Sequence, residues 1–352
     1  MIGVFLIILV VLGLYAIMGL WMLTRKSPQQ LPTQKASPSM CVVIAARNEA
    51  ENLSSLLPKL MGKELRVIVA NDHSTDETEE VARKQGAEVV LSAGEGKKAA
   101  LKTAVEKVGE EWILFLDADV LVEEKFLTDA RDAISKQSAS VCLFPIKVQN
   151  PKGFRQHFDA SDMASLIFTT KAFADAGRAI MGNGAAMAVR ASFYRSSLEH
   201  LRNDIASGDD TFLVQHAVQT GEEVRFVDAE GLTVGIAANP SWSAFFKQRI
   251  RWGKKTTAYQ SDTAKFIGWL VFLSNLIVCL AWIAAPWNLD LLYIPLFKGI
   301  IDLDFFHRIS GRLQQKHLRK YLLLTVLIYP FYISAAALGG LFVSPEWKGR
   351  RS

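Results

Sequence analysis

Residues Met1–Leu23 form an apolar run that contains no charged side chain. A run of this length can cross a bilayer as a helix. It has no basic residue before it and no small-residue cleavage site after it, so we expect an uncleaved anchor, residues 1–24, and not a signal peptide. Arg25 and Lys26 follow at once. The positive-inside rule therefore places the next segment in the cytoplasm of the cell, under an inner membrane that the chain crosses several times.

The C-terminal part, residues 263–343, is apolar again. Phe266–Pro286 and Tyr321–Val343 are strong membrane segments, whereas Leu289–Ile301 is short and carries two charges. The loop before the last segment is basic, which favours the cytoplasm. If all three segments cross, the basic tail, residues 344–352, lies outside, which the same rule disfavours. One segment is then re-entrant or interfacial, and the sequence leaves open which.

Composition excludes several function classes. The net charge of +5 is modest and scattered, and no aromatic and basic module for nucleic acid is present, so we expect no nucleic-acid partner. The three cysteines, Cys41, Cys142 and Cys279, are far apart, which argues against a disulfide framework or a zinc cluster. The modest positive net charge suits a protein beside an anionic membrane face.

Between the apolar ends, a linker, residues 25–39, leads into a soluble-looking domain, residues 40–262. This domain alternates short apolar runs with helical patterns, which predicts a parallel, doubly wound α/β sheet. The expected strands are Cys41–Ala46, Leu65–Ala70, Ala87–Leu91, Trp112–Leu116 and Ser140–Pro145, and the expected helices between them are Glu51–Leu60, Asp76–Gln85 and Lys97–Lys107. In such sheets, ligands bind beyond the carboxyl ends of the strands.

The triplet Asp117-Ala118-Asp119 follows the run Trp112–Leu116 without a gap. Both carboxylates should therefore emerge in the ligand crevice. Two carboxylates separated by one residue can bind a hard divalent cation that phosphate oxygens also bind. The alternative is a solvated turn at the end of the strand.

The ends of the first two strands carry further polar residues. Ala46 and Glu49 follow the first strand, and Asp72 follows the second. Ser74 or Thr75 can cap the next helix, with Asp76 in its first turn. Capping does not require Asp72, whose carboxylate can accept the imide N–H of a uracil ring.

Two more polar segments precede predicted helices. Gly94-Glu95-Gly96-Lys97-Lys98 can place backbone N–H groups and a lysine near phosphate, although it matches neither a Walker loop nor a dinucleotide fingerprint. Gly208-Asp209-Asp210 precedes the helix Thr211–Gln219. Its two acids can charge a helix start, or one of them can act as a general base.

The segment Gln248-Arg249-Ile250-Arg251-Trp252 lies in an expected amphipathic helix, residues 241–259. Its basic and aromatic residues are typical of a helix at the membrane interface. Arg251 could also pair with a diphosphate, and Trp252 could form a flat wall for an acceptor sugar or lipid.

These signals occur in the order found in family 2 glycosyltransferases, and the chain from about Met40 to Lys255 resembles their membrane-bound branch, which includes cellulose synthase, hyaluronan synthase and ceramide glucosyltransferase. The resemblance implies a GT-A fold with a doubly wound mixed sheet. It departs from the family pattern at Asn71 and His73, where an Asp and a Gly are usual.

The resemblance also implies roles for individual residues. Ala46, Glu49 and Asp72 would line the nucleoside pocket, with Lys97 near the uracil or the phosphates. Asp117 would contact the nucleotide, and Asp119, with Asp117, would hold Mn²⁺ or Mg²⁺. Asp210 matches the family's catalytic base, with Asp209 beside it. The residues Gln248, Arg251 and Trp252 match the motif near the diphosphate and the acceptor.

The resulting hypothesis is an inverting, metal-dependent glycosyltransferase that moves a sugar from a UDP-sugar to a lipid or other membrane-associated acceptor. Three alternatives stay open at this point: a processive polysaccharide synthase, an inactive transferase-like membrane scaffold, and a nucleotidyltransferase on a similar sheet. The scaffold is disfavoured because Asp117, Asp119 and Asp210 are all present. The nucleotidyltransferase is disfavoured because no glycine-rich basic loop follows the first strand.

Overall fold

The computed structural model describes residues 2–27, 37–62, 65–202, 205, 208–229, 231–342, 346–347 and 350–351. The chain divides into two compact units. Unit 1 contains Met1–Lys26, Asn150–Ala172 and Ala238–Ser352, and unit 2 contains Ser27–Gln149 and Phe173–Ala237. Each unit is described by itself. Most of the expected linker and of the basic tail lies outside the described residues.

Unit 2 is built on a seven-stranded sheet with the order β3-β2-β1-β4-β7-β5-β8. β1 pairs in parallel with β2 and β4, whereas β7 runs antiparallel to β4 and β5, so the sheet is mixed. A second, two-stranded sheet pairs β6 with β9. The strand bounds are β1 Met40–Ala46, β2 Arg66–Asn71, β3 Glu88–Leu91, β4 Trp112–Asp117, β5 Val141–Leu143, β6 Ile146–Val148, β7 Ala186–Arg190, β8 Val224–Phe226 and β9 Val234–Ile236.

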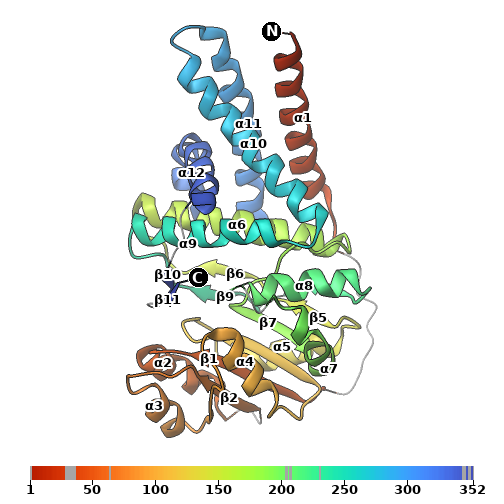
Figure 1. Ribbon diagram of the computed structural model, residues 1–352, viewed down its shortest axis with the longest axis vertical. Coiled ribbons are helices and arrows are strands. Elements are labelled where there is room, and N and C mark those ends of the chain that lie inside the picture. The colour runs from red at the N-terminus through yellow and green to blue at the C-terminus, as the bar shows by residue number, and fades with distance from the viewer. Residues whose placement is uncertain are drawn as a thin grey trace. The chain divides into compact units, whose positions relative to one another are not determined.

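Helices connect these strands and cover the sheet (Figure 1). β1 and β4 are apolar and almost completely buried, as central strands covered on both faces should be. The helices of unit 2 are α2 Ala50–Leu60, α3 Thr78–Lys84, α4 Lys97–Val105, α5 Phe126–Ser135, α7 Ala191–Ser197 and α8 Asp209–Gln219, with a 3₁₀ turn at Leu198–His200. The predicted doubly wound mixed sheet is confirmed.

Unit 1 consists mainly of helices. They are α1 Ile2–Thr24, α6 Gly153–Asp175 (up to Ala172), α9 Trp242–Lys254, α10 Asp262–Ala284, α11 Tyr293–Arg312 and α12 Leu322–Phe342, with 3₁₀ turns at Lys255–Ala258, Leu289–Leu292 and Lys316–Tyr321. Two short strands, β10 Glu346–Trp347 and β11 Arg350–Arg351, pair near the C-terminus. In Figure 1, α1, α10 and α11 run up the page, and α6 and α9 run across it.

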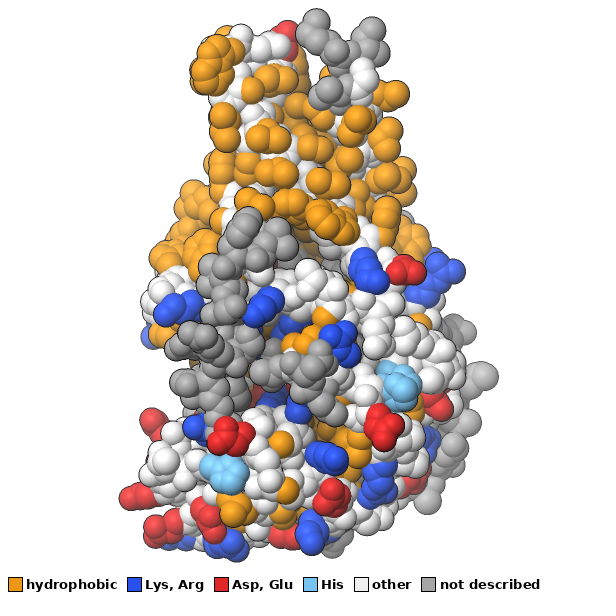
Figure 2. Space-filling model, in the orientation of Figure 1, with side chains coloured by type: hydrophobic (Ala, Val, Ile, Leu, Met, Phe, Trp, Pro, Cys, Tyr) orange, Lys and Arg blue, Asp and Glu red, His pale blue; other side chains and the backbone are white. Residues whose placement is uncertain are grey.

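Three helical segments among the described residues are long and apolar enough to cross a membrane: Phe5–Thr24, Asp262–Ala284 and Lys316–Gly340. Figure 2 shows that hydrophobic side chains dominate the visible face of the upper helices. The weak segment predicted at Leu289–Ile301 forms part of α11, which continues to Arg312. The basic residues expected in a loop before the last segment are therefore helical: His307, Arg308 and Arg312 lie in α11, and Lys316, His317, Arg319 and Lys320 lie in the 3₁₀ turn that follows.

A buried ion-pair network joins α6 to α9. The guanidinium of Arg249 lies 2.6 Å from an oxygen of Asp162 and 2.9 Å from an oxygen of Asp159, and all three side chains are at most 3% exposed. Tyr329 of α12 donates a hydrogen bond of 3.0 Å to Asp162. Because two carboxylates share one cation here, removing the cation would leave both charges buried without their partner.

We expect Arg249→Met to destabilise the protein by about 3–5 kcal/mol, the usual cost of breaking a buried ion pair. Arg83→Met is the matched control, because Arg83 pairs with Glu79 on the exposed face of α3 and such pairs contribute only about 0–1 kcal/mol. Thermal unfolding of the purified protein in detergent checks this. Equal unfolding temperatures for the two variants would contradict the prediction.

Candidate functional site

The carboxyl ends of three neighbouring strands meet at one edge of the sheet in unit 2. Ala46 at the end of β1 is in register with Asn71 at the end of β2, and Ala45 is in register with Asp117 at the end of β4. The parallel pairing therefore places Asp72 and Asp117 on the two sides of β1. This is the edge where doubly wound sheets bind ligands.

Asp72 is 2% exposed and connects two loops. Its Oδ1 accepts a hydrogen bond of 2.8 Å from the backbone N–H of Gly96, and its Oδ2 lies 3.9 Å from the guanidinium of Arg47. Gly96 has a φ of +93°, a conformation that favours glycine, and it directly precedes α4. Asp72 thus holds the glycine loop against the end of β2, a contact that the sequence did not suggest.

Hydrogen bonds connect the loop after β1 to the loop after β2. Ser74 accepts a hydrogen bond from the backbone of Asn48, and Thr75 donates one from its backbone to the side chain of Asn48. Asp76 accepts hydrogen bonds from the backbone of Ala50 at the start of α2 and of Thr78 at the start of α3. Ser74 and Thr75 therefore join the two loops and do not cap α3, which begins later than expected.

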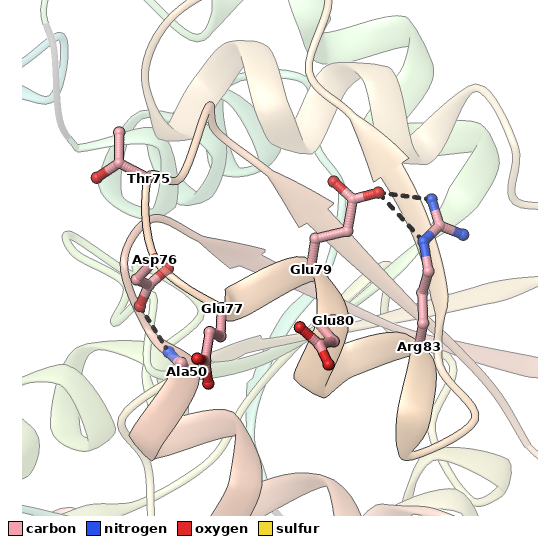
Figure 3. Close-up of a pocket in the computed structure, with 7 residues that line it drawn as sticks. All are labelled: Ala50, Thr75, Asp76, Glu77, Glu79, Glu80 and Arg83. Carbon is pink, nitrogen blue, oxygen red and sulfur yellow. Dashed lines mark hydrogen bonds and ion pairs between the residues drawn. The ribbon is translucent and has the colours of Figure 1, made fainter.

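An open pocket lies over the first turns of α2 and α3. Figure 3 shows that Asp76 faces Ala50 and that Glu79 faces Arg83, with the other acidic side chains spread around them. It is lined by Ala50, Thr75, Asp76, Glu77, Glu79, Glu80 and Arg83. None of these residues was predicted to belong to the site, and their contacts include helix-start hydrogen bonds and a surface ion pair.

His73 adopts a left-handed backbone conformation, with a φ of 53°. This conformation is unfavourable for residues that have a Cβ atom, and glycine adopts it freely. The resemblance described above implies a Gly at this position, and the left-handed backbone is consistent with that. In this chain, histidine is held there by the braced loops on either side.

Lys97 lies among carboxylates at the start of α4. Its Nζ is 2.6 Å from Oδ1 of Asp117, and both side chains are partly exposed. Burial opposes the charge on Lys97, but Asp117, Asp209 and Asp210 outweigh it and raise the pKa of the ammonium group. Lys97 is therefore charged at any physiological pH. The adjacent Lys98 instead donates to the backbone oxygens of Leu201 and Arg202, and so fastens the segment before α8.

Asp119 lies close to other carboxylates. Desolvation, followed by the charges of Asp117 and Glu49, raises the pKa of its carboxyl group, although its side chain reaches solvent. Such a concentration of carboxylates fits a divalent cation, which would relieve the repulsion. Among the described residues no group of three or more His, Cys, Asp or Glu side chains is placed to hold a metal ion. Of the described residues, Asp117 and Asp119 are the candidate ligands, and a bound phosphate would supply others.

The loop Gly182-Asn183-Gly184 packs against the start of α8. A Cβ atom at Gly182 would lie 2.9 Å from the backbone oxygen of Asp210, and one at Gly184 would lie 3.0 Å from Nζ of Lys97. Asn183 fixes the loop by donating to the oxygen of Phe144 and accepting from the N–H of Ala186. The two glycines therefore allow Asp210 and Lys97 to approach the same short loop.

Asp209 and Asp210 begin α8 directly after Gly208, whose φ is +93°. Asp210 accepts a hydrogen bond of 2.7 Å from the N–H of Thr211, and both aspartates are half-buried. The predicted helix thus starts two residues earlier than expected and includes both acids. Their charges act on Lys97, so the structure brings together Lys97, Asp117, Asp209 and Asp210.

Tyr194 of α7 belongs to the same region, and the sequence analysis missed it. Burial and the charge of Asp209 raise the pKa of its phenol. It lines a small crevice beside Lys97, Gly184 and Asp209. No spacing pattern in the sequence singles out this tyrosine, because only the folded strand order brings α7 next to α4 and α8.

The predicted residues Gln248, Arg251 and Trp252 lie on α9 of unit 1. The side chain of Gln248 accepts hydrogen bonds from Asn239 and Arg249. The ring of Trp252 stacks under the guanidinium of Arg249, 4.4 Å from its centre. Arg249 thus makes the main side-chain contacts of α9 described here. The sequence motif had instead singled out Arg251, which is half-buried and also has partners.

Known proteins are similar to parts of this chain. Glycosyltransferase AglJ of Haloferax volcanii is 32% identical over 108 residues, which cover 30% of this chain and 35% of the relative. The 4,4'-diaponeurosporenoate glycosyltransferase of Staphylococcus haemolyticus is 32% identical over 130 residues, which cover 34% and 35%. The chain thus spans about a third of the length of these curated relatives.

A mannosyltransferase, PcManGT of Pyrobaculum calidifontis, solved in complex with GDP-Man and Mn²⁺, has the same fold with a TM-score of 0.60. It is 16% identical, and the match covers 97% of each chain. Residues 41–198 match the model of the family described as "Glycosyl transferase family 2". A specific likeness to ceramide glucosyltransferase stays a prediction. This match includes β1, β2 and β4 of the GT-A-like sheet and spans less than half of the chain.

Proposed function

We propose that the protein transfers a sugar from a nucleotide-sugar to a lipid acceptor at the membrane, with inversion at the anomeric carbon. The observation that carries this proposal is the meeting of three strand ends with Asp72, Asp117 and Asp119, next to a helix that begins with Asp209 and Asp210. The family match to residues 41–198 supports the same reaction class.

The nucleoside would bind beside Ala46, Glu49 and Asp72. Glu49 is held by a hydrogen bond from Asn52, and its backbone N–H donates to Thr78, so the end of β1 is rigid before a ligand arrives. Asp72 would accept from the base, as the sequence analysis predicts for a uracil ring. The mannosyltransferase neighbour was solved with GDP-Man, so both UDP- and GDP-sugars need to be tested.

The diphosphate would bind near Asp117 and Asp119 together with a divalent cation. Without a cation, these carboxylates and Glu49 would repel a diphosphate, because Lys97 is already paired with Asp117. Mn²⁺ or Mg²⁺ held by Asp119 and Asp117 would neutralise the charge that develops on the leaving diphosphate. Lys97 would add its own positive charge on the side of the glycine loop. Arg251 is expected to pair with the diphosphate on the evidence of its motif.

Asp210 would act as the general base, with Asp209 beside it. Its carboxylate would take the proton from the acceptor hydroxyl as the oxygen forms a bond to the anomeric carbon. The bond from that carbon to the diphosphate breaks, and its electron pair leaves with the diphosphate. Because attack comes from the opposite face, the product would have inverted configuration.

The membrane helices favour a lipid as the acceptor. α9 leads through a 3₁₀ turn into α10, which is long and apolar enough to cross a bilayer. One relative is named for 4,4'-diaponeurosporenoate, a carotenoid acid. We place the transferase domain on the cytoplasmic side, where nucleotide-sugars are made, because Arg25 and Lys26 follow α1.

A panel of labelled donors tests the function directly. Membranes that contain the protein are incubated with labelled UDP- and GDP-sugars in the presence of Mn²⁺, and the extracted lipids are analysed by mass spectrometry. We expect one donor to label one lipid class, with the anomeric configuration opposite to that of the donor. Label in a long polysaccharide would support the processive alternative, and no transfer from any donor would contradict the proposal.

We expect Asp119→Ala to lose transfer by at least about a hundredfold, because the metal would contribute several kcal/mol to the transition state. Asp132→Ala is the control: Asp132 is an exposed acid of α5 that pairs with Lys136 on the surface. Initial rates are measured across a Mn²⁺ titration, and membrane insertion is checked by fractionation. Full activity of the parent protein in excess chelator would show that no metal is needed.

We expect Asp210→Asn to lose about a hundredfold to ten-thousandfold in single-turnover rate, the usual contribution of a general base. The amide oxygen can still accept the hydrogen bond from Thr211, so the start of α8 should remain intact. Nucleotide affinity, measured in parallel, should stay near the parent value. Asp209→Asn should be milder. A parental transfer rate for Asp210→Asn, or a product with retained configuration, would exclude this mechanism.

A further inference from the structure

α12 is apolar and long enough to span a membrane, and it packs against α10 and α11, but it also contacts α6 and α9. At its start, the ring of Tyr321 lies 5.8 Å from Phe154 and 4.9 Å from His157, both on α6. Two turns later, Tyr329 donates to Asp162, also on α6. The turn before α12 and the middle of α12 therefore contact α6.

The second half of α12 rests on α9. The ring of Tyr332 lies 5.0 Å from Phe245. A Cβ atom at Gly339 would lie 3.0 Å from the side chain of Ile250, and one at Gly340 would lie 3.1 Å from the backbone nitrogen of Lys254. A helix that stands on a layer touches it with one end only. The layer of α6 and α9 is contacted just before α12 by Tyr321, in the middle of α12 by Tyr329 and Tyr332, and near its end by Gly339 and Gly340.

α6 and α9 cannot lie within the hydrocarbon core. On α9, Lys247 is exposed, and Arg251 and Lys254 are half-buried. On α6, Arg155 is half-buried close to the N-terminal end. Charged side chains that face lipid at the centre of a bilayer are costly, so these two helices belong to the membrane surface. A helix that lies across both of them (Figure 1) must stay near that surface as well.

The outer face of α12 is apolar. Its exposed side chains recur every three or four residues and so form one stripe: Leu323, Leu324, Leu327, Phe331, Ala335 and Leu338. Just before the helix, Lys316 and Lys320 are exposed. The apolar stripe can contact the acyl chains of the lipids, and the lysines before it can contact anionic headgroups.

α11 is a second helix in this unit whose position allows it to cross a membrane (Figure 1). It returns from α10 after a short connection, and its outer face carries the exposed apolar residues Leu296, Phe297 and Ile300. Its two central charges are buried, with Nζ of Lys298 2.6 Å from Asp302, and Asp302 also accepts a hydrogen bond from Tyr15 of α1. In Figure 1, α11 runs beside α1 and α10, whereas α12 is seen nearly along its axis.

We propose that α12 lies flat in one leaflet, with its apolar stripe against the acyl chains, and that α1, α10 and α11 are the helices that cross the membrane. The C-terminus then lies on the same side as Gln314, in the connection that precedes α12. Arg350 and Arg351 fall on the side of Arg25 and Lys26, as the positive-inside rule requires. This resolves the conflict that arises if Phe266–Pro286, Leu289–Ile301 and Tyr321–Val343 all cross.

The depth of spin labels along α12 tests the orientation. Leu323→Cys and Leu338→Cys are labelled in the full-length protein in phosphatidylcholine and phosphatidylglycerol vesicles, and depth is measured from collisions with oxygen and with a nickel chelate. A crossing helix would separate these positions by about 22 Å along the bilayer normal, at 1.5 Å per residue. We expect depths that differ by less than about a quarter of that.

Phe266→Cys and Leu280→Cys on α10 are the matched controls, since both parent residues are more than half exposed and a crossing helix separates them by about 21 Å. The parent protein, whose three cysteines are buried, provides the background. A depth profile along α12 as steep as that along α10 would overturn the proposal.

The side of the C-terminus gives a second, independent readout. Gln314→Cys and a cysteine added after Ser352 are treated with a membrane-impermeant thiol reagent in intact cells, with Asn288→Cys between α10 and α11 as the reference. We expect Asn288→Cys to react and the other two to react only after the membrane is opened. Labelling of the C-terminal cysteine in intact cells, with Gln314→Cys protected, would show that α12 crosses.

Discussion

The parallel register of β1 between β2 and β4 is the constraint on which the candidate site depends. It fixes Ala46 beside Asn71 and Ala45 beside Asp117, so the residues that follow these strands must share one edge. The apolar, buried side chains of β1 and β4 maintain the register, because a slip of one residue would turn them toward the wrong face. The polar residues at the edge contribute little to this pairing.

The charges at this edge are unbalanced. Asp117, Asp119, Asp209, Asp210 and Glu49 act within a small region on Lys97 or on one another. Like charges brought together by folding are unfavourable until a cation or a positively charged ligand group joins them. The backbone braces of Asp72 and Asn183 hold the surrounding loops in place against this repulsion. The arrangement is typical of a site that is built for its ligand more than for stability.

Much of the fold of unit 2 could be predicted from the sequence. Its central strands, such as Trp112–Asp117, are continuous apolar runs with polar residues at one end. Sequence alone could not predict that Lys97 pairs with Asp117 or that Tyr194 lies beside them, because both contacts depend on the strand order. α6 escaped prediction since it buries Asp159 and Asp162 together with apolar residues, which removes a clear amphipathic pattern. The hydropathy of α12 predicts burial in lipid but carries no information about which helices lie beside it.

The contact between α1 and α11 has a consequence for how the protein is assembled. Tyr15 bonds to Asp302 across 287 positions of the sequence, and Nζ of Lys298 lies 4.6 Å from the ring of the same tyrosine. A helix with two charges leaves the insertion machinery most easily when a polar partner already waits in the lipid. α1 would then supply this polar partner when α11 enters the membrane, and a purely apolar helix could not do so.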